Sequence, residues 1–223
     1  MIGPLITENP FGLPGLHWRE GRFAVTSASA LTLGPVTVTL PDALRHAAAK
    51  RKSEYLAGRL CAAYALRAAG LPEAVGTKDR APVWPIGAVG SISHSDARAV
   101  AVVSRDLAGL GVDIEPLLTP AQALDIQDMI LTKAEADMQP PDLTFPEFLT
   151  LLFSAKEALY KALSARLLQM PAFLDVVLVE MTPATLTLRL GADTVTAHFI
   201  LSNTDVTTLV AMDASAKGGS AQP

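Results

Sequence analysis

The sequence has a single cysteine, no long apolar run and no excess of basic residues. Cys61 is the only cysteine among 223 residues, so an internal disulfide bond is excluded. It lies in an apolar stretch, and we interpret it as a small buried core residue. No apolar run reaches the roughly 18 residues that a membrane-spanning helix needs. The formal net charge of −4 gives the molecule as a whole no electrostatic basis for binding nucleic acid.

The first eleven residues also lack a basic segment followed by an apolar core, so we expect no signal peptide there. Together with the absence of a membrane span, this predicts a cytoplasmic protein. Half of the residues are hydrophobic and 18% are charged, which is typical of a folded globular chain. The length allows one large domain or two small ones.

We expect two halves, each with one long helix and a small sheet. In the first half the predicted elements are a weak strand at 22–27, a helix at 42–69 and strands at 89–93, 99–104 and 110–115. Gly70 and Pro72 follow the helix and favour its end there. Pro116 marks the boundary, so the first half is predicted to span residues 1–116.

The second half, predicted at 117–213, places its helices before its strands. The predicted elements are a helix at 121–130, a short helix after Thr132, a long helix at about 145–168, and strands at 173–181, 184–190, 194–201 and 206–212. The close spacing of these strands predicts hairpins and an antiparallel sheet. Residues 214–223 are small and polar and are predicted to be disordered. The predicted fold class is therefore α+β, with a helix on a mostly antiparallel sheet in each half.

Two segments combine acids and lysines without a neighbouring histidine or cysteine. One is Gly111–Glu115 (GVDIE), where side chains alternate along a strand, so Asp113 and Glu115 face the same way. The other is Phe153–Lys161 (FSAKEALYK), which places Glu157 four residues before Lys161 on one helix face. Each segment alone is more typical of exposed acids or a surface ion pair. Together, carboxylates for a hard cation and lysines for phosphate indicate metal-assisted phosphoryl transfer.

Two further segments are candidates for binding an anion. Arg51, Tyr55 and Arg59 are spaced by four along the first long helix, and two arginines there can grip a phosphate. Gly90–Ser95 (GSISHS) surrounds His94 with small hydroxyl residues, which can bind phosphate or a sugar. Taken alone, the arginines are more typical of a solvated face and the histidine of a hydrogen-bonded structural residue.

The order of these motifs resembles a known family. GVDIE followed by FSAKEALYK resembles the paired signature of the large, single-chain 4′-phosphopantetheinyl transferases. Three further stretches resemble the branch typified by enterobactin synthetase component D, namely Lys50–Ala62 (KRKSEYLAGRLCA), Arg80–Gly87 (RAPVWPIG) and Gly90–Ser95. The resemblance covers about residues 45–165. Ala158 stands where this branch often has serine, a departure that leaves Glu157 and Lys161 in place.

The resemblance implies two similar halves related by a pseudo-twofold axis, with coenzyme A bound in the cleft between them. It also implies a reaction, the transfer of phosphopantetheine from coenzyme A to a serine of an apo carrier protein with release of adenosine 3′,5′-bisphosphate. The branch favours carriers of siderophore or other non-ribosomal peptide synthesis over polyketide and fatty-acid carriers. Since one chain supplies both halves, we expect a monomer.

The resemblance further implies a role for each candidate residue. Asp113, Glu115 and Glu157 would hold Mg²⁺ against the pyrophosphate of coenzyme A. Glu157 is also the candidate base for the serine proton, and the sequence leaves open which of its two roles dominates. Lys161 would complete the catalytic set at the pyrophosphate, with Lys156 as a second phosphate contact. The residues expected at the nucleotide end and its 3′-phosphate are Arg51, Arg59, Arg80, His94 and, more weakly, Ser93.

Two other functions compete with this one. A coenzyme A-binding regulator without catalysis would fit the arginines, but the intact Asp113, Glu115, Glu157 and Lys161 argue against it. A Mg²⁺-dependent nucleotide phosphohydrolase would use water as the nucleophile and would need no carrier protein.

Overall fold

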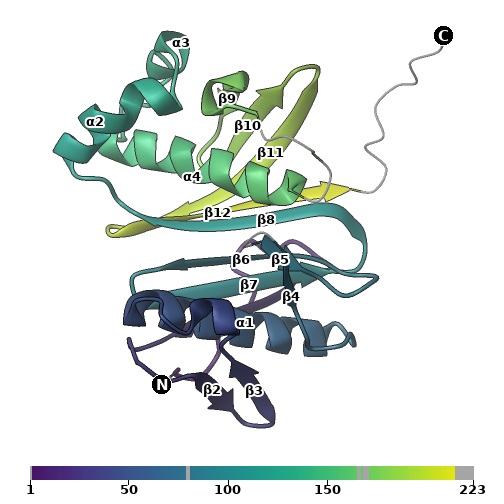
Figure 1. Cartoon of the computed structure of the whole chain (residues 1–223). Helices are drawn as coiled ribbons and strands as arrows, with labels where there is room; N and C mark the ends of the chain where they lie inside the picture. The colour runs from purple at the N-terminus through teal and green to yellow at the C-terminus, as the bar shows by residue number, and fades with distance from the viewer. Residues whose placement is uncertain (1, 79–80, 165–166, 168–170, 214–223) are drawn as a thin grey trace. The chain divides into compact units, whose positions relative to one another are not determined.

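The chain forms two units, Met1–Asp106 and Leu107–Pro223, in a computed structural model that describes residues 2–78, 81–164, 167 and 171–213. Each unit packs one long helix on an antiparallel sheet, as predicted from the sequence (Figure 1). Among these described residues, the helices are all too short or too polar to cross a membrane.

The first unit is built on a three-stranded sheet in the order β1-β7-β6. Its strands are β1 (His17–Arg22), β6 (Val89–Ser95) and β7 (Arg98–Ser104), and the long helix α1 (Ala49–Ala68) contacts all three. The smaller elements are the hairpin of β2 (Ala30–Leu33) with β3 (Val36–Thr39), the hairpin of β4 (Gly76–Lys78) with β5 (Ala81–Val83), and the 3-10 turn η1 (Asp42–Leu44).

Two elements of the first unit differ from the sequence prediction. The first strand lies at His17–Arg22, and of the expected 22–27 segment only Arg22 belongs to it. Val25, the central apolar residue of the expected 22–27 segment, is 59% exposed. The weak alternation of that segment therefore did not mark a face buried along its whole length. Helix α1 begins at Ala49, and Asp42–Leu44 forms the separate turn η1. The run between them is rich in alanine, which favours helix throughout and hides this break.

The second unit is built on a five-stranded sheet in the order β8-β12-β11-β10-β9. Its strands are β8 (Leu107–Pro116), β9 (Val176–Met181), β10 (Thr185–Leu190), β11 (Asp193–Leu201) and β12 (Asp205–Asp213). The last four form successive hairpins, as the sequence predicted. Its helical elements are α2 (Pro120–Ile130), α3 (Lys133–Ala136), α4 (Phe145–Leu163) and the 3-10 turn η2 (Phe173–Asp175).

The boundary between the units lies ten residues before the proline at which the sequence placed it. Strand β8 pairs with β12 along its length, with Pro116 opposite Asp205 and Asp113 opposite Thr208. The whole of β8 therefore belongs to the second sheet. The expected disordered segment at 214–223 lies outside the described residues.

The helices α2, α3 and α4 begin where their capping residues stand. Each starts after a threonine that forms a capping box with a Gln or Glu three residues later. The box predicted at Thr132 is formed, since the Thr132 backbone N–H donates to Glu135 at 2.7 Å. Helix α4 ends at Leu163, before the predicted end at 168.

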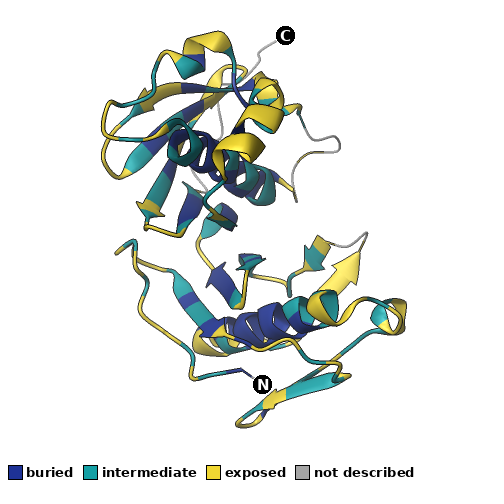
Figure 2. Cartoon of the chain, turned by 90° about the vertical axis from the view of Figure 1, so that its left-hand side faces the viewer, coloured by how far each residue is buried: buried dark blue, intermediate teal, exposed yellow. Residues whose placement is uncertain are grey.

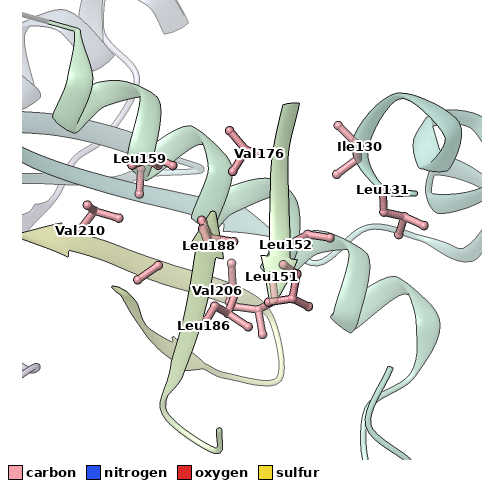
Figure 3. Packing of buried hydrophobic residues seen from close by; sticks show 14 of the residues in the cluster. Ile130, Leu131, Leu151, Leu152, Leu159, Val176, Leu186, Leu188, Val206 and Val210 are labelled. Atoms are coloured by element: carbon pink, nitrogen blue, oxygen red, sulfur yellow. The ribbon is translucent and has the colours of Figure 1, made fainter. Parts of the chain in front are cut away.

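The apolar side of α4 builds the core of the second unit. Figure 3 shows Leu151, Leu152 and Leu159 of α4 packed among residues of the sheet. Those sheet residues include Val176, Leu186, Leu188, Val206 and Val210, and Ile130 and Leu131 extend the cluster towards α2. Figure 2 shows both long helices as mostly buried. This burial explains why so few positions of α4 can carry charge.

Two glycines let α4 lie directly on β8. A Cβ atom at Gly111 would stand 1.8 Å from the carbonyl oxygen of Ala158, and one at Gly109 would stand 2.6 Å from that of Ala162. Both obstacles are backbone atoms, which cannot rotate away as a flexible side chain can. The glycine of GVDIE is therefore required by the close approach of the two backbones.

Replacing Gly111 with alanine is expected to destabilise the protein by roughly 1–3 kcal/mol or more, because the added methyl group forces α4 away from β8. Urea unfolding of the two proteins measures the difference. Gly3→Ala is the matched control, since a Cβ there makes only an ordinary contact at 3.8 Å. Equal stability of the Gly111 and Gly3 variants would contradict the prediction.

Candidate active site

Strand β8 and helix α4 bring Asp113 and Lys161 together. Asp113 is 3% exposed, and its face of β8 is the one that α4 covers. The Lys161 ammonium donates to Asp113 Oδ1 at 2.6 Å and to the Val112 carbonyl oxygen at 3.1 Å. The two residues, 48 positions apart in the chain, thus form a charged pair at the interface between α4 and β8.

Ser154 holds the Asp113 carboxylate from its other side, and Thr208 is linked to Ser154. Ser154 Oγ donates to Asp113 Oδ2 at 2.9 Å and lies 2.9 Å from Thr208 Oγ1. The Thr208 hydroxyl in turn donates to the Ser154 carbonyl oxygen at 2.9 Å. Both side chains are buried. Sequence reasoning missed them, although Ser154 lies within the FSAKEALYK run and precedes Lys161 by two helical turns.

Glu157 completes this group with a second carboxyl. Burial raises the pKa of Glu157 above its ordinary value, the Asp113 charge raises it further, and Lys161 opposes both. Two carboxyls that influence each other in this way are best accommodated by a shared cation. Asp113, Glu157 and Lys161 are therefore near enough to one another for their charges to interact.

The raised pKa of Glu157 predicts a stability difference that depends on pH. The folded state holds this proton more tightly than the unfolded chain, so stability is lost as the pH rises above the ordinary glutamate value of about 4.3 and through the folded-state pKa. Glu157→Gln mimics the neutral carboxyl. It is expected to be more stable than the native protein at neutral pH in metal-free buffer, and equally stable near about pH 4. Thermal unfolding midpoints test this, and a less stable variant at neutral pH would contradict it.

The donor set of this group fits a hard divalent cation. Glu115 is half-buried and follows Asp113 on the same face of β8. Within residues 2–78, 81–164, 167 and 171–213, no three His, Cys, Asp or Glu side chains are grouped closely enough to hold a metal ion by themselves. Mg²⁺ usually takes one or two carboxylates and completes its shell with water and substrate phosphates. Asp113 and Glu157 meet that requirement.

Lys156 lies on another side of α4 and does not join the group. Its side chain has no exposed surface, and its ammonium lies 3.0 Å from Glu135 Oε1. It also donates to the carbonyl oxygens of Ile130 at 2.7 Å and Phe173 at 3.0 Å. Three acceptors occupy its three N–H groups. The expected phosphate contact is therefore corrected to a buried ion pair.

In the first unit the structure brings Arg51 and His94 together. Arg51 Nη1 lies 3.3 Å from His94 Nε2. Glu54, which sequence reasoning did not include, lies 3.9 Å from Arg51 and 3.8 Å from His94 Nδ1. The position of Glu54, three residues after Arg51 on α1, is the signal that could have found it.

Arg59 lies further along α1, with its guanidinium 5.2 Å from the centre of the Tyr55 ring. It donates to Thr77 Oγ1 at 2.9 Å, and its Nη1 is buried without a hydrogen-bond partner among the described residues. Arg59 is 7% exposed, and this burial lowers the pKa of its guanidinium. A buried guanidinium with an unused N–H group is suited to an anion.

The two remaining candidates of the first unit are Ser93 and Arg80. A Cβ at Gly58 of α1 would stand 2.7 Å from Ile92, so Ile92 faces α1, and His94 shares that face. Ser93 points to the opposite face of β6 and is buried there. The structure thus separates Ser93 from His94 and Arg51. Arg80 lies outside the described residues.

Comparison with known families gives two adjacent matches. A family model described as the 4′-phosphopantetheinyl transferase N-terminal domain matches residues 40–104. A second, described as the 4′-phosphopantetheinyl transferase superfamily, matches residues 109–211. The two matches together leave few residues outside them between 40 and 211, and they meet close to the boundary between the two units.

Three relatives illustrate the similarity. Enterobactin synthase component D of Salmonella typhi is 46% identical over 134 residues, which are 59% of this chain and 56% of that protein. The protein of the same name from Escherichia coli K12 is 47% identical over 122 residues, 53% of this chain and 58% of its own length. The 4′-phosphopantetheinyl transferase Npt of Nocardia iowensis is 36% identical over 117 residues, 51% of this chain and 52% of its own. The chain thus spans little more than half the length of these relatives.

Among solved structures, a holo-(acyl-carrier-protein) synthase from Bacillus anthracis in complex with CoA (3′,5′-ADP) superposes with a TM-score of 0.41 at 24% identity. It covers 49% of this chain and 99% of that one. The holo-[acyl-carrier-protein] synthase of Thermotoga maritima has a TM-score of 0.39 at 22% identity, covering 48% of this chain and 64% of its own.

Proposed function

The chain belongs to the 4′-phosphopantetheinyl transferase superfamily, and on this premise we propose that it transfers phosphopantetheine from coenzyme A to a serine of an apo carrier protein. The observation that carries the proposal is the convergence of Asp113, Lys161 and Glu157 between β8 and α4. A fixed carboxylate, an ammonium group and a second carboxyl at one place suit a reaction in which charge moves between phosphate oxygens.

The proposed reaction forms a bond between the serine oxygen and the phosphorus that carries pantetheine. The bond from that phosphorus to the bridging oxygen of the pyrophosphate breaks, and adenosine 3′,5′-bisphosphate leaves. Glu157 accepts the serine proton, directly or through a water molecule, since burial raises the pKa of its carboxyl above the ordinary value. Lys161 supplies positive charge to the pyrophosphate oxygens.

Mg²⁺ would be held by Asp113 and Glu115, with Glu157 as a further ligand only while it does not act as the base, and would neutralise charge on the phosphate oxygens when bound. Ser154 orients the Asp113 carboxylate from within the core. We further propose that the enzyme is a cytoplasmic monomer and that its carriers belong to siderophore or other non-ribosomal peptide synthesis. The names of the enterobactin synthase relatives support that choice of carrier.

The nucleotide end of coenzyme A is assigned to Arg51, His94 and Arg59. Arg51→Gln is expected to raise the KM for coenzyme A by roughly 10- to 100-fold, because a charge-assisted contact with the 3′-phosphate is lost. The same variant should use 3′-dephospho-coenzyme A nearly as well as the native protein. Steady-state kinetics with both substrates measure this, with Arg45→Gln as control because Arg45 is exposed and pairs with Asp42. If Arg51→Gln lost the same activity with coenzyme A and with 3′-dephospho-coenzyme A, Arg51 would not be a contact of the 3′-phosphate.

A panel of apo carrier proteins tests the proposed function. The native protein, Mg²⁺ and coenzyme A are incubated with carriers of siderophore, other non-ribosomal peptide, polyketide and fatty-acid synthesis. A mass gain of one phosphopantetheine on at least one carrier is the expected result, and Glu157→Gln should lose most of it. Binding of coenzyme A without modification of any carrier would favour a regulator instead. Release of adenosine bisphosphate without a carrier would favour a phosphohydrolase.

A further inference from the structure

The Asp113 carboxylate is already neutralised by the protein itself. Its Oδ1 accepts from the Lys161 ammonium at 2.6 Å, and its Oδ2 accepts from Ser154 at 2.9 Å. The residue is almost completely buried, so water screens this pair weakly. A cation therefore already occupies one oxygen of the carboxylate to which the proposed function assigns a metal ion.

A divalent ion and this ammonium group repel each other at such a short range. At partly buried positions two charges a few ångströms apart interact strongly, and a divalent ion doubles the effect. Mg²⁺ also needs a near-ideal octahedral shell at short distances, which an ammonium on the same oxygen obstructs. Lys161 thus opposes binding of the ion for as long as it stays on Asp113.

Lys161 is the partner that can move. Its side chain is 30% exposed, whereas that of Asp113 is 4% exposed. Lysine carries its charge on a flexible four-carbon stem, and Lys161 lies in the last turn of α4. Asp113 is fixed in the middle of the β8–β12 ladder and tied to Ser154, which is itself tied to Thr208. The carboxylate stays in place when the ammonium swings away.

We propose that Lys161 is a resident counter-cation that competes with divalent metal for Asp113, so that the protein without substrate binds the metal weakly. An anionic pyrophosphate draws the ammonium off Asp113 and opens the carboxylate to the ion. The identity of that anion rests on the proposed function, whereas the competition between Lys161 and the metal does not. Lys161 thereby orders the loading of the site, since the metal binds well only with the anion.

The test is direct binding of Mn²⁺, followed by electron paramagnetic resonance, to the full chain without coenzyme A or carrier. Lys161→Met is expected to bind Mn²⁺ about tenfold tighter than the native protein, since a nearby positive charge is removed. Lys161→Arg keeps that charge and should stay near the native affinity. Lys133→Met is the control, because it removes the same charge from an exposed position of the same unit. Adding Asp113→Asn to Lys161→Met should abolish the gain.

Several outcomes overturn the proposal. They are an unchanged or weaker Mn²⁺ affinity of Lys161→Met, an equal gain in Lys161→Arg or Lys133→Met, and no Mn²⁺ binding by any variant. Circular dichroism checks folding, and Lys161→Gln replaces the methionine variant if that one unfolds. The carrier panel separates this proposal from the proposed function. If the native protein modifies no carrier but Lys161→Met gains Mn²⁺ affinity, the competition between Lys161 and the metal stands and the proposed function fails. If the native protein modifies a carrier but Lys161→Met gains no Mn²⁺ affinity, the proposed function stands and the competition fails.

Discussion

Asp113→Ala is expected to lower the rate of carrier modification by roughly 10³-fold or more, because several kcal/mol of electrostatic stabilisation depend on this carboxylate. Asp113 is the point at which three interactions meet. It pairs with Lys161, accepts from Ser154 and raises the pKa of Glu157. Its removal leaves Lys161 without its carboxylate partner and takes a ligand from the proposed metal site.

Single-turnover transfer at saturating coenzyme A measures this loss, at ordinary and at raised Mg²⁺ concentration. A partial recovery at raised Mg²⁺ would assign the loss to the metal. Asp193→Ala is the matched control, because Asp193 is an exposed acid at the start of β11 in the same sheet. Near-normal transfer by the Asp113 variant at ordinary Mg²⁺ would remove Asp113 from the mechanism.

Lys156→Met is expected to destabilise the protein by roughly 3–5 kcal/mol, because it leaves a buried carboxylate without its cation. Glu135 is 1% exposed and accepts from the backbone N–H groups of Thr132 and Leu178 as well as from Lys156. The variant also leaves the carbonyl oxygens of Ile130 and Phe173 without this donor. The ion pair ties α4 to the end of α2, to α3, to η2 and to β9, so the loss affects the whole helical cover of the second sheet.

Urea unfolding of Lys156→Met, Glu135→Gln and the double variant measures the coupling between the two residues. We expect the double variant to lose much less stability than the two single losses added together, because neither charge then remains unpaired. Lys133→Met, an exposed change on α3, should cost little. A cost for Lys156→Met as small as that of the control would show that the pair contributes little.

Periodicity and capping residues predicted most elements of the second unit. The box of Thr132 with Glu135 placed α3, and the alternating runs after Pro171 placed the four hairpin strands. These signals are local, because a cap acts within one helical turn and alternation within one strand. The run at 22–27 shows the limit of such signals, since its alternation was weak and the strand formed one segment earlier.

The two lysines of FSAKEALYK show what local signals could not decide. Both were predicted to contact phosphate. Lys156 instead lies in a buried ion pair with Glu135, whereas Lys161 pairs with Asp113 and its phosphate contact stays a prediction. Five residues correspond to about 140° around a helix, so the two ammonium groups leave α4 in different directions. Which direction meets the sheet depends on how the helix is rotated about its axis. Gly109 and Gly111 decide this by admitting the backbone of α4 against β8.

By itself, the sequence determined the family through the order of its motifs, and it determined where most helices and strands lie. Only the tertiary structure decided that β8 pairs with β12 and belongs to the second unit, that Ser93 faces away from His94, and that Ser154 holds Asp113. Motifs and periodicity are properties of neighbouring residues. Strand partners and hydrogen bonds across 41 positions, such as Ser154 to Asp113, arise only when distant segments pack.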